Sequence, residues 1–175
     1  MAQFATRIPT SMTLLAARNL YLQENGLSTR VYQDLWYPIS IGPLRLWIPL
    51  PPRVRQATAL HDLHHVLTGY GADLVGETEI SAWELAAGLG VWWPNWAITF
   101  PSFLFGLLVY PRRTLRAFAR GRGCRSLFVD AVPYETLLTM HVEELRARLG
   151  ISPSGATERP ARLRRRAAGQ RTAVK

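Results

Sequence analysis

Residues 54–77 read VRQATALHDLHHVLTGYGADLVGE, and this stretch carries the strongest structural signal in the chain. Pro51 and Pro52 stand immediately before it, where proline is compatible with the first turn of a helix. From Val54 the chain has no Gly or Pro until Gly69, and glycine commonly ends a helix. The stretch therefore predicts a helix from Val54 to about Gly69, followed by a turn.

Helical patterns continue on both sides of this stretch. Residues 11–25 place apolar groups at helical spacing and stop at Gly26, and an amphipathic helix is expected at about 134–149. Residues 36–52, WYPISIGPLRLWIPLPP, are rich in proline and predict a loop with room for one short hairpin. The predicted fold class is all-α, a single-domain helical bundle with an irregular Pro-rich segment before the histidine-bearing helix.

Composition limits the kinds of protein and site to be considered. The chain has 175 residues, of which 48% are hydrophobic and 19% charged, as expected for one folded domain with a buried core. Cys124 is the single cysteine, which excludes an internal disulfide and a thiolate zinc cage. We therefore expect a reducing compartment, and the first 23 residues lack the apolar core and cleavage site of a secretory signal.

Positive charge is concentrated at the C-terminal end. Residues 152–175 hold seven basic residues against Glu158 alone, so +6 of the formal net charge of +9 lies in this segment. The segment has almost no large apolar residue, which predicts a flexible basic tail beyond a helical domain at 1–151. A solvated terminus is the favoured interpretation, ahead of attraction to anionic lipid head groups or nonspecific contact with nucleic acid.

Residues 85–111, LAAGLGVWWPNWAITFPSFLFGLLVYP, form a long uncharged stretch. Its length would permit a transmembrane helix, but Pro94 and Pro101 favour two shorter helices, at about 79–91 and 96–110. These two helices would either be buried or lie on a bilayer. A run of arginines begins at Arg112, and an apolar, Trp-rich surface followed by arginines is typical of a membrane interface. We expect a cytoplasmic protein that associates peripherally with the inner membrane face.

The histidine cluster of the first stretch predicts a metal site. On a helix, His61 and His65 are one turn apart on the same face, and the carboxylate of Asp62 can reach the same edge. Glu77 follows the turn and could return as a fourth ligand. Two imidazoles favour Zn²⁺, while two carboxylates leave Mn²⁺, Fe²⁺ or Mg²⁺ open. His64 is the additional histidine; a surface position is expected for it, with a role as partner of a ligand or as proton carrier as the alternatives.

Two other histidine motifs fit less well. In the zinc-protease motif HExxH the residue after the first histidine is a glutamate that acts as the base, whereas here Asp62 stands there. The HD phosphohydrolase arrangement needs a histidine well upstream, and no histidine precedes His61. Neither motif is therefore favoured.

The spacing His-Asp, two residues, His, eleven residues, Glu resembles the metal motif of the coenzyme Q biosynthesis protein 4 family. Three later segments, GETEISAWELA, RGRGCRSLF and VEELRARLGI, resemble later blocks of that family, so the likeness spans Val54 to Ile151. It is poor upstream of Val54, and His64 stands where the family usually has a bulky apolar residue.

This resemblance implies an all-helical, membrane-peripheral protein that handles polyprenylated aromatic intermediates of ubiquinone synthesis. The family is associated with oxidative decarboxylation at the first ring carbon and with organising other biosynthetic enzymes. By the resemblance, the metal ligands and catalytic residues are His61, Asp62, His65 and Glu77. Residues 85–111 would line a groove for the prenyl tail. Lipid head groups would meet Arg112, Arg113, Arg116 or Arg120.

Three classes of function remain open at this level. The first is a metal-dependent enzyme acting on a prenylated quinone precursor, and the second is a lipid-binding scaffold for other quinone-biosynthesis proteins. The third is a metal-dependent hydrolase of another substrate. Expected partners are an isoprenoid or prenylated precursor, a membrane surface and other proteins of the pathway, with a homodimer as an open alternative. No specific nucleic-acid partner is expected.

Overall fold

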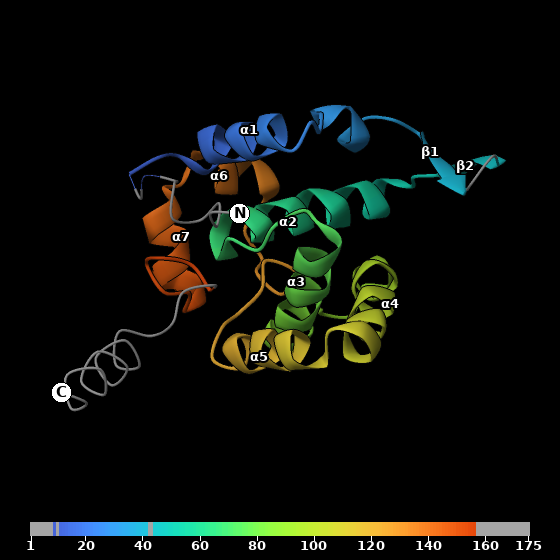
Figure 1. Cartoon of the computed structure of the whole chain (residues 1–175). Coiled ribbons are helices and arrows are strands. Elements are labelled where there is room, and N and C mark those ends of the chain that lie inside the picture. The colour runs from blue at the N-terminus through green and yellow to red at the C-terminus, as the bar shows by residue number, and fades with distance from the viewer. Residues whose placement is uncertain (1–8, 10, 42–43, 157–175) are drawn as a thin grey trace.

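The computed structural model describes residues 9, 11–41 and 44–156. Within these residues the chain forms seven α-helices: α1 (Leu14–Glu24), α2 (Pro52–Thr68), α3 (Leu74–Ala87), α4 (Trp93–Val109), α5 (Pro111–Gly121), α6 (Tyr134–Thr139) and α7 (Val142–Leu149). A 3₁₀ helix, η2 (Thr29–Tyr32), follows α1. The helices pack into one bundle (Figure 1), which confirms the all-α prediction.

A short hairpin occupies the Pro-rich segment. Strands β1 (Trp36–Ile41) and β2 (Leu44–Pro49) pair antiparallel, with Trp36 opposite Pro49 and Ile41 opposite Leu44. The sequence predicted a loop here that could contain one short hairpin. It extends away from the bundle beyond the N-terminal end of α2 (Figure 1), so the fold remains helical.

The α2–turn–α3 unit is built as the sequence indicates. Pro52 lies in the first turn of α2, and Gly69 ends the helix with φ of 82°, a left-handed conformation that favours glycine. The side chain of Asp73 then caps α3 by accepting a hydrogen bond from Gly76 N at 2.7 Å. Gly76 packs so closely that a Cβ built there would lie 1.9 Å from the carbonyl oxygen of Gly71. The turn is therefore short and tightly packed.

The core is formed where α1, α2, α3, α6 and α7 meet. Its fully buried apolar side chains include Leu14, Leu63, Leu67, Ile80, Trp83, Leu137 and Leu145. Helices α4 and α5 pack on α3 through glycines. A Cβ built at Gly121 would lie 2.4 Å from the carbonyl oxygen of Trp83, and one built at Gly106 would lie 2.7 Å from Thr78 Cβ. These contacts bring the helix backbones close together.

Residues 12–14, at the start of α1, pair with residues 140–142, between α6 and α7. Leu14 N donates to the carbonyl oxygen of Met140 at 2.8 Å, and Val142 N donates to that of Met12 at 3.0 Å. This pairing holds Met140 and His141 in an extended conformation. The prediction of one helix over 134–149 is therefore wrong, because the backbone breaks between α6 and α7 to make these bonds.

Arg146, on α7, is almost fully buried and holds the C-terminal end of α2. Its guanidinium donates to the carbonyl oxygens of Leu67 at 2.8 Å, Val66 at 3.4 Å and Pro153 at 2.7 Å. Ala156 N donates to Thr68 O at 2.8 Å, so residues 152–156 lie against the bundle. The rest of the predicted basic tail, 157–175, lies outside the described residues.

The uncharged stretch 85–111 is divided between the end of α3 and α4, so two helices are present as expected, but their bounds differ from 79–91 and 96–110. The break between them lies at residues 88–92, and Pro101 lies inside α4. The first ends earlier than expected, at Ala87, because Gly88 adopts a φ of 109°. The second begins at Trp93, with Pro94 accommodated in its first turn. Among the residues that the structure describes, no helix is both long and apolar enough to span a bilayer.

Candidate metal centre

His61, His65 and Glu77 form the centre of the candidate site. The two histidines lie one turn apart on α2, and Glu77 lies in the first turn of α3, across the glycine turn. The Nε2 atoms of the histidines are 3.2 Å apart, and Glu77 places Oε2 at 3.2 Å from His61 Nε2 and Oε1 at 3.2 Å from His65 Nε2. One ligand atom from each residue therefore falls within 4.8 Å of the others.

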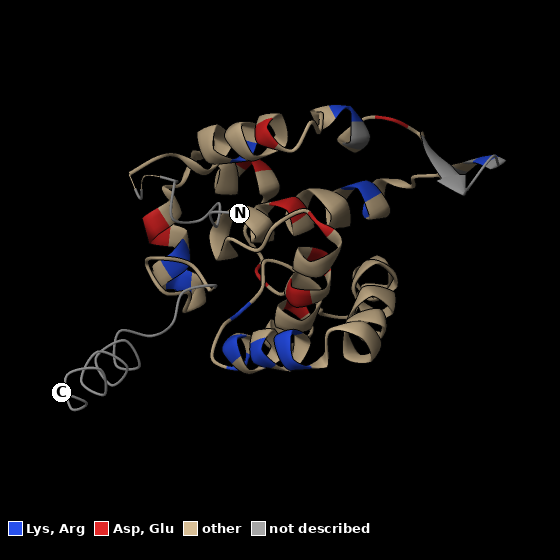
Figure 2. Cartoon of the chain, in the orientation of Figure 1, with Lys and Arg blue, Asp and Glu red and all other residues tan. Residues whose placement is uncertain are grey.

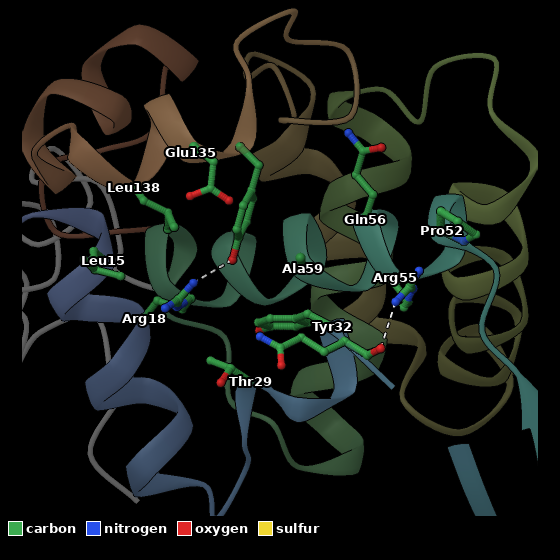
Figure 3. Close-up of a pocket in the computed structure, with 12 residues that line it drawn as sticks. Leu15, Arg18, Thr29, Tyr32, Pro52, Arg55, Gln56, Ala59, Glu135 and Leu138 are labelled. Carbon is green, nitrogen blue, oxygen red and sulfur yellow. Dashed lines mark hydrogen bonds between the residues drawn. The ribbon is translucent and has the colours of Figure 1, made fainter. Parts of the chain in front are cut away.

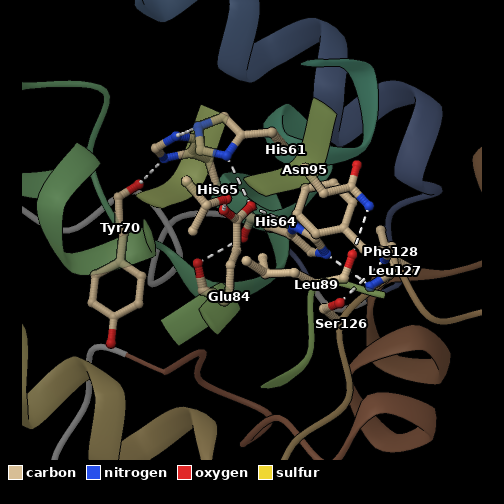
Figure 4. Close-up of polar contacts among 12 residues, drawn as sticks. His61, His64, His65, Tyr70, Glu84, Leu89, Asn95, Ser126, Leu127 and Phe128 are labelled. Atoms are coloured by element: carbon tan, nitrogen blue, oxygen red, sulfur yellow. Dashed lines mark hydrogen bonds and ion pairs between the residues drawn. The ribbon is translucent and has the colours of Figure 1, made fainter. Parts of the chain in front are cut away.

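The other ring nitrogen of each histidine has a fixed partner. His61 Nδ1 lies 2.8 Å from Glu84 Oε1, and His65 Nδ1 lies 3.0 Å from the carbonyl oxygen of Tyr70 (Figure 4). A carbonyl and a carboxylate only accept hydrogen bonds, so both histidines donate from Nδ1. In the neutral rings the lone pairs are therefore on the two Nε2 atoms, which point toward one another.

This arrangement favours a positive charge between the three residues. Two nitrogen lone pairs and a carboxylate at 3.2 Å repel one another unless a proton or a cation lies among them. Burial lowers the pKa of His61, but Glu84 and Glu77 outweigh this effect and raise it well above its ordinary value. Burial likewise raises the pKa of Glu77, yet hydrogen bonds from His61 and His65 hold it well below its ordinary range.

The donor set fits a divalent cation. Two neutral imidazoles and one carboxylate are ligands for Zn²⁺, Mn²⁺ and Fe²⁺, and catalytic zinc sites commonly combine three protein ligands with one open position. Both histidines are buried, whereas the side chain of Glu77 is 35% exposed. Access to the centre is therefore from the Glu77 side. The group is a candidate metal site, and the choice of Zn²⁺ stays a prediction.

Asp62 lies beside the candidate centre but points elsewhere. Its Oδ2 accepts a hydrogen bond from the Tyr32 hydroxyl of η2, and Asp62 is not one of the three residues whose ligand atoms converge. Burial raises the pKa of Asp62 and also that of Tyr32. The prediction that Asp62 is a ligand stays a prediction, since its carboxylate would have to leave Tyr32.

His64 is buried, and the expectation of a surface position is wrong. Its Nε2 accepts a hydrogen bond from Leu127 N at 2.8 Å, so its proton is on Nδ1, which donates to Glu84 Oε1 at 2.7 Å. Burial lowers the pKa of His64, and the hydrogen bond from Leu127 also requires the neutral ring. His64 thus shares Glu84 with His61 and has no direct hydrogen bond to a predicted metal ligand.

Glu84 contacts two histidines of the site and was not among the predicted ligands. It is fully buried on α3, and besides the two histidines it accepts a hydrogen bond from Thr99 Oγ1 at 2.9 Å. Burial alone would raise the pKa of Glu84, but His61 and His64 lower it to about 2. A signal was present, because Glu84 is seven residues after Glu77 and therefore on the same helix face.

Other polar residues near the predicted ligands have structural roles. Asp73 caps α3, and Glu79 pairs with Arg113 at 2.9 Å. Trp83 is fully buried in the core. Tyr70 supplies a carbonyl oxygen to His65, and the Tyr21 ring stacks on His65 with centroids 5.4 Å apart.

A family model described as coenzyme Q (ubiquinone) biosynthesis protein Coq4 matches residues 53–155 of the chain. This range covers α2 to α7, including all the residues of the candidate centre. Comparison with curated proteins and with solved structures gave no match.

Proposed function

Since the chain belongs to the coenzyme Q (ubiquinone) biosynthesis protein Coq4 family, we propose that it is a metal-dependent, membrane-peripheral protein that acts on prenylated aromatic intermediates of ubiquinone synthesis. The proposed reaction is oxidative decarboxylation at the first ring carbon. The observation that carries the proposal is the convergence of His61 Nε2, His65 Nε2 and the Glu77 carboxylate. Quinone precursors with a carboxylate or phenolate suit such a centre because these groups bind divalent cations.

The residues of the centre have distinct roles in this proposal. His61, His65 and Glu77 would hold the ion, with Asp62 as the proposed fourth ligand. When bound, the ion supplies Lewis-acid stabilisation of negative charge on the substrate's carboxylate or phenolate. Glu84 and the carbonyl oxygen of Tyr70 accept hydrogen bonds from the Nδ1 atoms, so in the neutral rings the Nε2 lone pairs face the ion. The ring is oxidised in this reaction, so O₂ or a partner protein must accept the electrons.

Elemental analysis of the purified protein is the direct test. About one Zn²⁺, Mn²⁺ or Fe²⁺ per chain is expected in the wild type, and Glu77→Ala and His65→Ala should lose it. Glu143→Ala is the matched control, since Glu143 is an exposed acid on α7, away from the centre. Circular dichroism would verify that each variant is folded. A folded wild type without metal would contradict the proposed mechanism.

A second candidate function, a lipid-binding scaffold, is favoured by the surface of α4 and the residues just before it. Large apolar side chains are exposed here, including Trp93 at 60% and Leu108 at 85%. Figure 2 shows this uncharged helix beside α5, which carries a row of basic residues. An apolar surface next to arginines suits a bilayer surface with anionic head groups.

One variant separates the two candidates. If the protein is an enzyme, Glu77→Ala with retained fold abolishes decarboxylation of prenylated hydroxybenzoates. If the protein is a scaffold whose metal only joins α2 to α3, the same variant keeps lipid binding, and the wild type shows no turnover. The α4 surface would serve both functions, because a prenylated substrate is itself dissolved in the membrane.

A further inference from the structure

A pocket of about 590 Å³ lies between α1, η2, α2 and α6 (Figure 3). Two arginines line it: Arg18 from α1 and Arg55 from α2. Tyr32 and Tyr134 also line it, and the Tyr32 hydroxyl is bonded to Asp62, the residue next to His61 on α2. The volume is in the range of small-molecule sites.

The two arginines carry positive charge without an acidic partner among the described residues. Arg18 is buried, with only 9% of its surface exposed. Its guanidinium donates to the hydroxyl of Tyr134 at 3.0 Å and to Asn19 Oδ1 at 2.8 Å. Arg55 donates from Nη1 to the carbonyl oxygen of Gln33 at 2.8 Å, while its Nε is buried with no hydrogen-bond partner. None of the described ion pairs includes either residue.

The buried guanidinium of Arg18 has neutral hydrogen-bond partners, so no negative charge compensates its positive charge. Burial of a charge is unfavourable unless an opposite charge and hydrogen bonds compensate it. Glu135 is the acidic residue that lines the pocket; it is exposed, and none of the ion pairs among the described residues includes it. The pocket is therefore matched to an anionic group with several oxygens, such as a carboxylate or a phosphate.

A second groove of about 260 Å³ continues from this pocket. Gln56 and Tyr134 line both, which places the two side by side along α2. The second groove is lined by apolar side chains, among them Trp92, Phe128 and Val132, and by polar ones, including Asn95 and Asp130, whose carboxylate pairs with Arg148. It leads to Trp92, which is 44% exposed at the start of the apolar α4 surface. The charged pocket thus has an apolar extension.

We propose that the arginine pocket binds the anionic head group, a carboxylate or a phosphate, of an amphipathic small molecule. The apolar chain of this ligand runs past Gln56 and Tyr134 into the second groove. Arg18 and Arg55 bind the head group oxygens. This site is separate from His61, His65 and Glu77, and the inference does not depend on the proposed function.

Isothermal titration calorimetry on the full chain tests the proposal with decyl phosphate, decanoate, butyl phosphate, inorganic phosphate and decanol, each below its micelle concentration. The wild type should bind one of the two charged decyl compounds, and the tighter one identifies the head group. Arg55→Gln and Arg18→Gln should each weaken that binding by roughly tenfold or more, as the loss of a charged hydrogen bond requires. Arg30→Gln removes one positive charge from an exposed residue of η2 that does not line the pocket, and it should not change the affinity for the probes.

A comparison of chain lengths and one further variant test whether the second groove binds the apolar chain. In the wild type, decyl phosphate should bind at least roughly tenfold more tightly than butyl phosphate, because additional methylenes are buried. Gln56→Trp places a bulky ring at the junction and should remove this gain while butyl phosphate still binds. Equal binding by the Arg18, Arg55 and Arg30 variants, or equal binding of decanol and the charged decyl compounds, would overturn the proposal.

Discussion

Glu84 Oε1 lies 2.8 Å from His61 Nδ1 and fixes which nitrogen of that histidine faces the candidate centre. Because a carboxylate only accepts hydrogen bonds, the proton of the neutral ring is on Nδ1 and the lone pair is on Nε2. Glu84 is fully buried, so its charge acts on His61 with little screening. A ligand histidine with such a carboxylate partner is oriented and made more basic.

We therefore expect Glu84→Gln to weaken metal binding while the fold is kept. A glutamine oxygen can still accept from His61 and His64, and its amide can donate to Thr99 Oγ1, so each of these three contacts keeps a hydrogen bond. Only the negative charge is lost, and the metal affinity should fall by roughly 10- to 100-fold. Competition titration with a chelator of known affinity measures the change. Glu143→Gln serves as control, and an unchanged affinity in Glu84→Gln would mean that its charge does not act on the centre.

Asp62 and Tyr32 allow a test of the proposed fourth ligand. The Tyr32 hydroxyl bonds to Asp62 in the structure, so it competes with any metal for this carboxylate. Tyr32→Phe should strengthen metal binding by the free energy of one hydrogen bond, about 1 kcal/mol. Asp62→Asn should weaken it. If Asp62→Asn instead binds the metal as the wild type does, Asp62 serves to hold η2 on α2.

Gly76 links the stability of the α2–α3 turn to the position of Glu77. A Cβ there would lie 1.9 Å from Gly71 O, a backbone atom that cannot rotate away. Gly76→Ala should lower the free energy of unfolding by about 3 kcal/mol or more, measured by urea denaturation, and should weaken metal binding because Glu77 is displaced. Gly123→Ala is the matched control, since a Cβ at Gly123 has no atom within 4 Å. Equal stability of the two variants would show that the turn adapts.

Membrane binding should depend on both the α4 surface and the exposed arginines of α5. Arg113 is unsuitable for this test because it pairs with Glu79. Arg112→Gln with Arg116→Gln should reduce binding to anionic vesicles by about 1 kcal/mol per residue, and added salt should diminish the difference. Trp93→Ser with Trp96→Ser should reduce binding also to neutral vesicles. Sedimentation with liposomes measures both effects, and Arg30→Gln is the control. If both double variants bind vesicles as the wild type does, the membrane contact lies elsewhere on the protein.

Local signals account for what the sequence predicted correctly. The proline start and glycine end of α2 are properties of neighbouring residues, and His61 and His65 meet because of helix periodicity alone. Glu77 joins them because the turn is short and α3 begins at its own cap, Asp73. The family resemblance rested on the same local spacing and on three later segments of the sequence.

What the sequence did not reveal depends on contacts between distant segments. From the sequence, His64 was expected at the surface. It is buried, and the backbone N–H of Leu127, 63 residues later, donates a hydrogen bond to it. The break between α6 and α7 arises because Met140 and Val142 pair with residues 12–14. Arg18 and Arg55 likewise meet only after α1 and α2 have packed. No periodicity within one segment encodes such meetings.

The pairing of Leu14 with Met140, and of Val142 with Met12, has a consequence for synthesis on the ribosome. Helix α1 is made early, yet two of the backbone bonds that fix its start need residues made near the end of the described chain. The α2–α3 unit closes over a short loop and needs no such delay. We therefore expect the metal-bearing hairpin of helices to form first during translation, with α1 docking only after α7 has emerged.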